Sequence, residues 1–280
     1  ERLRTLLAAL CHVVTEPDFN PRGGMVHLGN PNMAIVRFMP LLYAASLIPD
    51  HPQAERWLSV SKDFVRYKFA SNTAPGGGGW SELFSYYDAS APALVHATNI
   101  LDQAGSASEE VRKVAVEVGS FPLHYLTPTD PRFGIRAVPA WGHEGRVTLG
   151  QWLPASRLAR PFDAGLSKAL LWGWKEVGLL LSYHDVAFNR RCTLYADRAD
   201  IPVSEIKTHL GSRWTPGIGA VLRAHAGDPD ETYFSYRQGY MISHSDDNQG
   251  DFILFSKGAP LVDLNLFAYP LHQHDPYREL

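Results

Sequence analysis

The sequence predicts an α+β protein in which a helical domain packs on an antiparallel β-sandwich. Apolar residues recur at helical spacing as far as about residue 183, and short β-type runs separated by turn residues replace them after about residue 190. Successive helices followed by successive strands imply two packed layers. We place the boundary within 190–215 and assign 1–195 to the helical domain and 196–280 to the β-sandwich.

Apolar periodicity predicts three helices in the first part of the chain. Residues 1–14 have the i, i+3, i+4, i+7 spacing of one buried helix face, and the residues expected on it are Leu3, Leu6, Leu7, Leu10, Val13 and Val14. A second helix should start at Pro31, with Asn30 as its N-cap and a kink at Pro40. The apolar residues of 57–69 predict the third.

Three further helices should follow the Gly-rich breaker Pro75–Gly79. The first is expected over about 89–101, and the next after the capping-box spacing Ser106–Glu109. Residues 120–160 are rich in Pro and Gly and are expected to be mostly loop. The last is a strongly apolar helix over about 163–183.

Four short runs predict the strands, which are 218–223, 232–237, 252–255 and 261–264. The last two flank a Gly-containing turn, so they should form a hairpin. A polar loop that begins at His244 leads into this hairpin.

The composition limits the class of protein. A net charge of −3 gives no global basic field, so nucleic acid is not expected as a partner. Cys11 and Cys192 are too few for a disulfide framework or a metal cluster, and no run of about 18 apolar residues predicts a membrane span. The chain starts at Glu1 inside a helical pattern without a signal peptide, so we expect a fragment or a processed chain.

The stretch from His244 to Asp263 carries the most information about function. It joins an imidazole, the side chain best suited to proton transfer near neutral pH, to a dense set of polar residues and the hairpin. A hydrated surface loop is the alternative. The order of residues resembles the start of the C-terminal β-sandwich of heparinase II/III-like polysaccharide lyases. The matching positions are His244, Asp247, Asn248, Phe252, Leu254, Gly258, Pro260, Leu261 and Asp263.

That resemblance implies an incomplete (α/α) toroid, of which this chain holds the latter part, followed by the first strands of an antiparallel β-sandwich. It makes His244 a candidate catalytic residue and Asn248 a candidate substrate-binding residue.

Asn30 and Asn32 flank the predicted helix start at Pro31. A capping role alone explains Asn30, but a helix N-terminus also favours anions, so either amide could bind a substrate carboxylate. In the resembled family an Asn near a helix start neutralises the uronate carboxylate, frequently as Asn-His. No His follows either Asn here, so the choice between them stays open.

An aromatic segment follows the four glycines. Trp80 is either core or a sugar-stacking surface, and the Gly-rich loop could place a phenol at a cleft. The family pattern has a Glu, often Ser-Pro, and then Tyr-His. Counted from Glu82, Tyr87 falls on the catalytic tyrosine, and Tyr86 is the alternative. The Ser-Pro is missing, and Asp88 stands at the His position.

Arg237 ends a predicted strand and could bind a carboxylate or sulfate bidentately, with an ordinary surface role as the alternative. No cofactor is expected. Some members of the resembled family hold a structural zinc with a His two positions after the catalytic His, where this chain has Asp246. Oxygen-rich surroundings would suit Ca²⁺ better, and solvated turn carboxylates are the alternative.

The chemistry implied is β-elimination at a uronic acid of an acidic polysaccharide. Asn30 or Asn32 would neutralise the carboxylate and stabilise the enolate-like charge. Tyr87 would be the acid, and also the base if nearby positive charge deprotonates its phenol, while His244 would be the base or its electrostatic partner. Family analogy also implies a periplasmic or secreted location. Two alternatives stay open: a glycoside hydrolase with Glu82 and Asp247 as its carboxylates, and an inactive protein that binds an acidic glycan.

Overall fold

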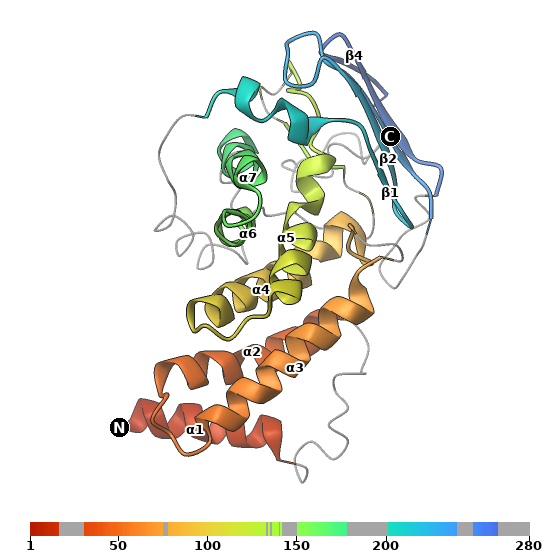
Figure 1. Cartoon of the computed structure of the whole chain (residues 1–280). Coiled ribbons are helices and arrows are strands. Elements are labelled where there is room, and N and C mark those ends of the chain that lie inside the picture. Colours follow the sequence, from red (N-terminus) through yellow and green to blue (C-terminus); the bar gives the residue numbers. More distant parts are fainter. Residues whose placement is uncertain are drawn as a thin grey trace.

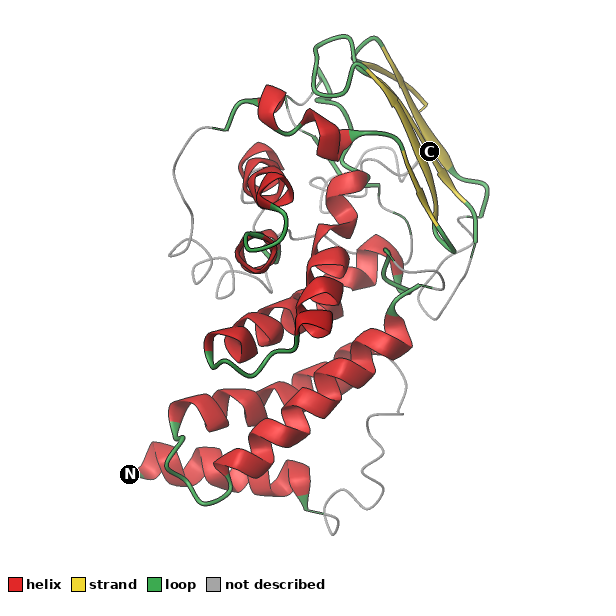
Figure 2. Ribbon diagram, viewed as in Figure 1, coloured by secondary structure: helices red, strands yellow, loops and turns green. Residues whose placement is uncertain are grey.

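The computed structural model describes residues 1–16, 31–74, 78–132, 134, 136–139, 141, 150–177, 201–239 and 249–262. They form seven α-helices, two short 3₁₀ helices and one five-stranded antiparallel sheet (Figures 1 and 2). All the α-helices precede the strands along the chain, which confirms the predicted α+β order. Within this described part, no helix is both long and apolar enough to cross a membrane.

The helices stack in the order in which they follow one another along the chain (Figure 1). Each α-helix contacts the next, from α1 on α2 through to α6 on α7. Their bounds are α1 Arg2–Thr15, α2 Pro31–Leu47, α3 Ala54–Asn72, α4 Leu83–Gln103, α5 Glu109–His124, α6 Trp152–Ala159 and α7 Ala164–Val177.

Two predicted helix starts are confirmed and one is shifted. Helix α2 begins at Pro31, and the Asp163 carboxylate accepts a hydrogen bond of 2.8 Å from the backbone N–H of Leu166 at the start of α7. The N-cap of α5 is Ser108 rather than Ser106, because the Ser108 hydroxyl accepts the bond from Val111 N–H. The two glutamates after Ser108 also suit the positive end of that helix.

The predicted buried face of α1 is wrong in part. Cys11 is buried and is a free thiol, and Leu7 and Val14 pack beside the core. These three lie at i, i+4 and i+7, so the core-facing stripe is narrower than the apolar pattern suggests. The exposed apolar residues of α1 are Leu3, Leu6, Leu10 and Val13.

Two further predictions fail because apolar helix faces were not recognised. Helix α4 begins six residues before Ala89, since Phe84, Tyr87 and Ala91 form a buried face at helical spacing. Helix α6 lies within 120–160, which was expected to be mostly loop. It is buried between α5 and α7, where a Cβ at Gly119 would come within 2.8 Å of Ala155.

The sheet is a meander in which neighbouring strands are also neighbours along the chain. The strands are β1 Arg213–Thr215, β2 Gly219–Ala224, β3 Thr232–Arg237, β4 Phe252–Ser256 and β5 Ala259–Val262. The predicted final hairpin is confirmed, with Lys257 and Gly258 both at positive φ as a type I′ turn requires. Strand β1 was not predicted, because three residues carry too little pattern.

The sheet contacts the helical part at two separate places along β3. We call the first the glycine contact, where Gly78 and Gly79 meet β1 and the β1–β2 turn, near the end of β3 at Arg237. We call the second the charge contact, formed by Arg136, Arg223 and Glu231 near the start of β3. The 3₁₀ helices η3 Val203–Glu205 and η4 Lys207–Leu210 pass over α7 (Figure 1).

Candidate functional site

The glycine contact has no room for side chains on the glycine loop. A Cβ at Gly79 would lie 2.7 Å from Cγ1 of Ile218, and one at Gly78 would lie 3.0 Å from Nη2 of Arg213. Gly78 also has a φ of +77°, a conformation that other residues rarely adopt. The glycines therefore bring the backbone against the sheet, in addition to the breaker role that the sequence predicted.

Backbone hydrogen bonds close this loop onto the end of α3. Ala74 N–H donates to the Gly79 carbonyl at 2.9 Å, and Ser81 N–H donates to the Asn72 carbonyl at 2.8 Å. Trp80, between these bonds, forms a β-bridge with Thr73. The start of α4 is thereby fixed relative to both α3 and the sheet.

A buried polar cluster follows directly. The indole N–H of Trp80 donates to the Ser90 hydroxyl at 2.9 Å, and the Ser90 hydroxyl donates to Oε2 of Glu82 at 3.0 Å. Trp80, Glu82 and Ser90 are all buried, so Trp80 is part of the core in this structure. The other carboxylate oxygen of Glu82 has no hydrogen-bond partner, although its charge interacts with that of buried Lys68.

Glu82 can titrate near neutral pH. Burial raises its pKa to about 7, against the opposing effects of Ser90, Trp80 and Lys68. Burial also lowers the pKa of Lys68. A buried carboxyl with a perturbed pKa beside a domain contact is typical of functional sites, although structural networks produce such shifts too.

Tyr87 lies one and a half turns into α4. It is fully buried, and its hydroxyl donates to the backbone carbonyl of Val118 on α5 at 2.9 Å. Its ring is near that of Phe121, with centroids 6.2 Å apart. The phenol is therefore held as a hydrogen-bond donor, with its position set by two helices.

Tyr125 and its neighbours form a buried polar group beside the glycine contact that sequence reasoning missed. Tyr125 directly follows α5, and burial raises its pKa to about 12, against the opposing effects of Thr215, Arg213 and Arg237. Nη1 of Arg213 lies 3.1 Å from Nε2 of His124. Burial, assisted by Arg213, lowers the pKa of His124 to about 3, so this imidazole is neutral and accepts the hydrogen bond.

The sequence contains a sign of this buried polar group, but local sequence patterns do not reveal its partner. His124 and Tyr125 are consecutive polar aromatic residues at the end of an apolar helix. Their partner Arg213 lies almost ninety positions further along the chain, at a separation of 89 from His124. Only the packing of the sheet on α5 brings them together.

Arg237 is buried, and its Nη1 donates to the Ile218 carbonyl at 2.8 Å. Its backbone N–H donates to the Asp251 carbonyl, and its carbonyl accepts from Gly250 N–H. Gly239 N–H donates to Oε1 of Gln249 at 2.9 Å. Both ends of the segment that carries His244 therefore lie beside Arg237.

The remaining predicted site residues are not all described. Asn30, His244 and Asn248 lie outside the described residues, as do Asp246 and Asp247. Asn32 is in the first turn of α2 and Tyr86 is in α4, but their side chains are outside the description. Their roles stay predictions.

One group in the described part of the chain has the composition of a metal site. His225, Asp228 and Asp230 each offer a ligand atom, and these atoms lie within 4.8 Å of one another. Lys207 already forms an ion pair of 2.6 Å with Asp228. The Lys207 ammonium group is therefore already the cation that pairs with this group.

Solved structures match the fold, whereas no family model and no curated protein matches the sequence. A heparinase III aligns with a TM-score of 0.58 and 17% identity over 85% of this chain and 33% of its own. Heparan sulfate lyase HepC from Pedobacter heparinus aligns with a TM-score of 0.56 and 14% identity over 84% of this chain and 32% of its own.

This chain therefore spans about a third of the length of these two enzymes. At this identity the likeness establishes the fold alone. The seven described helices and the five-stranded antiparallel sheet correspond to a partial helical toroid followed by the first strands of a β-sandwich.

Proposed function

We propose that the protein is a polysaccharide lyase that cleaves a uronate-containing polysaccharide by β-elimination. The glycine contact carries this proposal. Gly79 touches Ile218, the Ile218 carbonyl accepts from Arg237, and residues 239 and 249 adjoin Arg237. The loop that leads into Glu82 and the ends of the segment that carries His244 thus meet at one contact between helices and sheet, which supports a shared active site.

The likeness in fold adds support. The matched structures are named as a heparinase III and a heparan sulfate lyase, both of which act on acidic polysaccharides by name. A periplasmic or secreted location is part of the same proposal, since a polymeric substrate has to be met outside the cytoplasm.

The proposed mechanism uses three residues, one of which is either Asn30 or Asn32. The amide of Asn30 or Asn32 neutralises the substrate carboxylate and stabilises the enolate-like charge that develops when the C5 proton leaves. His244 takes that proton as the base. Tyr87 gives a proton to the departing 4-linked oxygen, and a C4–C5 double bond remains. We propose Tyr87 as the acid because it falls on the tyrosine of the resembled pattern; its hydroxyl, which donates to the Val118 carbonyl, would turn to the leaving oxygen when the substrate binds.

Trp80, Glu82, Tyr86, Arg237 and Asn248 are proposed to shape or bind the substrate site. For the buried Trp80, Glu82 and Arg237 we propose a supporting role, in which they hold the start of α4 and the end of β3 in place.

Ultraviolet absorbance tests the proposal directly. The purified protein is incubated with a panel of acidic polysaccharides, and the absorbance of the unsaturated uronate is followed with time. Growth of this band on one substrate is the expected result, and it also names the substrate class.

The same reactions separate the alternatives. New reducing ends without the double bond would indicate a glycoside hydrolase, for which Glu82 would be the first carboxylate to test. Binding of the polysaccharide with neither product would indicate an inactive glycan-binding protein. Either result would overturn the lyase proposal.

A further inference from the structure

The outer face of the sheet, which points away from the helices, is apolar. Figure 2 shows every described helix on one side of the sheet. Residues that lie opposite one another on neighbouring strands share a face, so the register divides the side chains into an inner and an outer set. The large side chains of the outer set are Trp214, Leu222, Phe234, Tyr236, Phe252 and Leu254.

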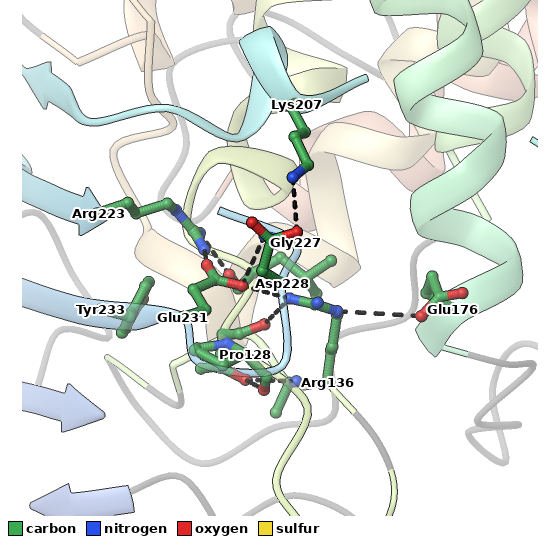
Figure 3. A network of polar contacts seen from close by, with 12 residues as sticks. Pro128, Arg136, Glu176, Lys207, Arg223, Gly227, Asp228, Glu231 and Tyr233 are labelled. Carbon is green, nitrogen blue, oxygen red and sulfur yellow. Dashed lines mark hydrogen bonds and ion pairs between the residues drawn. The ribbon is translucent and has the colours of Figure 1, made fainter. Parts of the chain in front are cut away.

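The charged side chains of the sheet lie on the inner face instead. Arg223 is on that face, where it forms an ion pair with Glu231 and its guanidinium carbon lies 4.6 Å from the centroid of the Tyr233 ring (Figure 3). Arg237 is on the same face. In the described strands β1 to β4, the outer positions hold no charged residue. A sheet with one solvated face normally has its polar residues on the outside, so this sheet has the opposite arrangement.

The outer side chains form one continuous patch. Trp214 is 63% exposed and Leu222 is 57% exposed, and the other four large residues are partly exposed. The ring centroid of Phe234 lies 6.3 Å from that of Tyr236 and 5.8 Å from that of Phe252. Strands about 4.8 Å apart and up to six residues long give this five-stranded face an area of roughly 400 Å². Apolar patches of this size are among the largest that monomers expose, and they are often interfaces.

The chemistry of the patch suits another sheet better than a sugar. Among its large side chains only Trp214 and Tyr236 carry a polar atom, and the Tyr236 hydroxyl already donates to Oε1 of Gln238 at 3.1 Å. An acidic polysaccharide requires cationic or amide groups, which the outer set lacks. The fold corresponds to the first strands of a β-sandwich, in which two sheets pack face to face about 10 Å apart.

A second copy of this chain offers a matching sheet. In a two-fold dimer each surface meets its own copy, so any charge on the surface would face a like charge. The net charge of −3 makes most surfaces of the chain poor candidates for such pairing, whereas the uncharged outer face is complementary to itself.

We propose that two copies of the chain associate through the outer faces of their sheets, which then form the two layers of a sandwich. The inference does not depend on the elimination chemistry, because Arg237 and the glycine contact lie on the inner side of the sheet. Dimer formation without lyase activity would leave it standing while the proposed function failed.

Analytical ultracentrifugation of the chain from about 0.1 µM to about 100 µM tests the proposal. We expect a monomer–dimer equilibrium with a dissociation constant on the order of 1–10 µM, since the patch is smaller than a standard interface. The dimer should persist in about 1 M salt, because apolar contacts are not screened. A monomer at every concentration, or association that continues beyond the dimer, would overturn the proposal.

Charged substitutions locate the interface. Leu222→Lys and Trp214→Lys should each weaken the dimer about tenfold or more, because association would bury an unpaired charge. Both side chains are exposed in the single copy, so the urea midpoint of the dilute variants should stay that of the wild type. Leu3→Lys is the matched control, since this 68% exposed leucine is on α1, at the opposite end of the molecule (Figure 1). Loss of the dimer in Leu3→Lys, or its survival in Leu222→Lys, would place the interface elsewhere and overturn the proposal.

A mixture of two variants separates a lost interface from a damaged fold. Leu222→Lys and Leu222→Glu should each dimerise poorly, because like charges meet across the two-fold axis. Mixed in equal amounts they should associate about threefold or more tightly than either alone, because opposite charges then meet. Association in the mixture that is no stronger than in the separate variants would show that the outer faces do not meet.

Discussion

Two buried glutamates, one near each contact between the helices and the sheet, have opposite surroundings. Glu231 accepts hydrogen bonds from two guanidinium groups and from Gly227 N–H, so both of its oxygens have partners. Glu82 accepts bonds on one oxygen only, and its other oxygen has none. Both side chains are fully buried.

This difference indicates a structural role for Glu231 and a titrating role for Glu82. A buried carboxylate between two guanidinium groups links segments distant in sequence, so the charge contact holds the sheet to the helices. A buried carboxyl for which desolvation outweighs the attraction of its nearest cation, here Lys68, is poised to change its protonation state, as the raised pKa of Glu82 indicates. We therefore expect changes at the glycine contact to affect activity or pH dependence, and changes at the charge contact to affect stability.

Of all the changes, Tyr87→Phe should have the largest effect, and this effect should be on lyase turnover. Loss of the proton donor should reduce lyase activity roughly 10²–10⁴-fold. The lost hydrogen bond to Val118 should cost only about 1 kcal/mol of unfolding free energy. Tyr233→Phe is the matched control, since its buried hydroxyl donates to the Tyr125 carbonyl at the charge contact. It should show the same small loss of stability with turnover unchanged, and equal turnover in both variants would remove Tyr87 from the mechanism.

Glu231→Gln should have the largest effect on stability. It leaves Arg223 buried without a carboxylate and Arg136 with only the half-exposed Glu176 at 3.9 Å, and breaking a buried ion pair in this way typically costs about 3–5 kcal/mol. Urea unfolding measures this cost through the midpoint. Asp50→Asn, which breaks an exposed ion pair with Arg4, is the control and should cost no more than about 1 kcal/mol. A similar cost for both variants would mean that the charge contact does not hold the sheet to the helices.

The local features of both contacts could be predicted from the sequence, but their partners could not. Apolar periodicity located most helices, and turn residues located β2 to β5, because these signals depend on residues a few positions apart. Arg136 and Glu231 are 95 residues apart, and no local pattern relates them. The division of the chain at residue 195 stays a prediction, since it falls outside the described residues.

The candidate site divides in the same way. Residue order made Glu82 and Tyr87 candidates. The buried group at His124 and Tyr125 depends instead on the sheet, since Arg213 follows His124 by 89 residues. The glycines before Trp80 were predicted to break a helix, but their close approach to Ile218 is a property of tertiary packing.

The pH dependence of the unfolding free energy should report on Glu82. The pKa of Glu82 rises from its ordinary 4.5 to about 7 on folding, so its ionisation opposes the folded state. Below the lower value the carboxyl is protonated in both states and has no effect. Between the two values only the unfolded state ionises, so the free energy of unfolding should fall as pH rises, by on the order of 3 kcal/mol in total.

Glu82→Gln should remove this fall. Urea unfolding at about pH 5 and about pH 8 measures it, and the difference in slope between wild type and variant isolates Glu82 from the other titrating groups. Glu55→Gln, at an exposed position, should keep the wild-type slope. Identical slopes for wild type and Glu82→Gln would mean that Glu82 is not the titrating group.

Gly79→Ala should have a smaller effect on stability, but this effect should extend to the candidate site. The added methyl would lie 2.7 Å from Cγ1 of Ile218, and overpacking of this kind typically costs about 1–3 kcal/mol. Gly211→Ala is the control, because its Cβ would come no closer than 3.7 Å to another atom, and its φ of −68° suits alanine. That variant should be neutral or slightly more stable.

A double-mutant cycle with Ile218→Ala decides whether the contact itself is responsible. Removing Cγ1 of Ile218 takes away the clashing atom, so Gly79→Ala should cost at least about 0.5 kcal/mol less in that background. If the glycine contact positions Tyr87 against the sheet, turnover should fall in Gly79→Ala and recover in part in the double variant. Additive losses of unfolding free energy, with unchanged turnover, would show that the glycines matter only for the conformation of their own loop. Both contacts would then have a purely structural role.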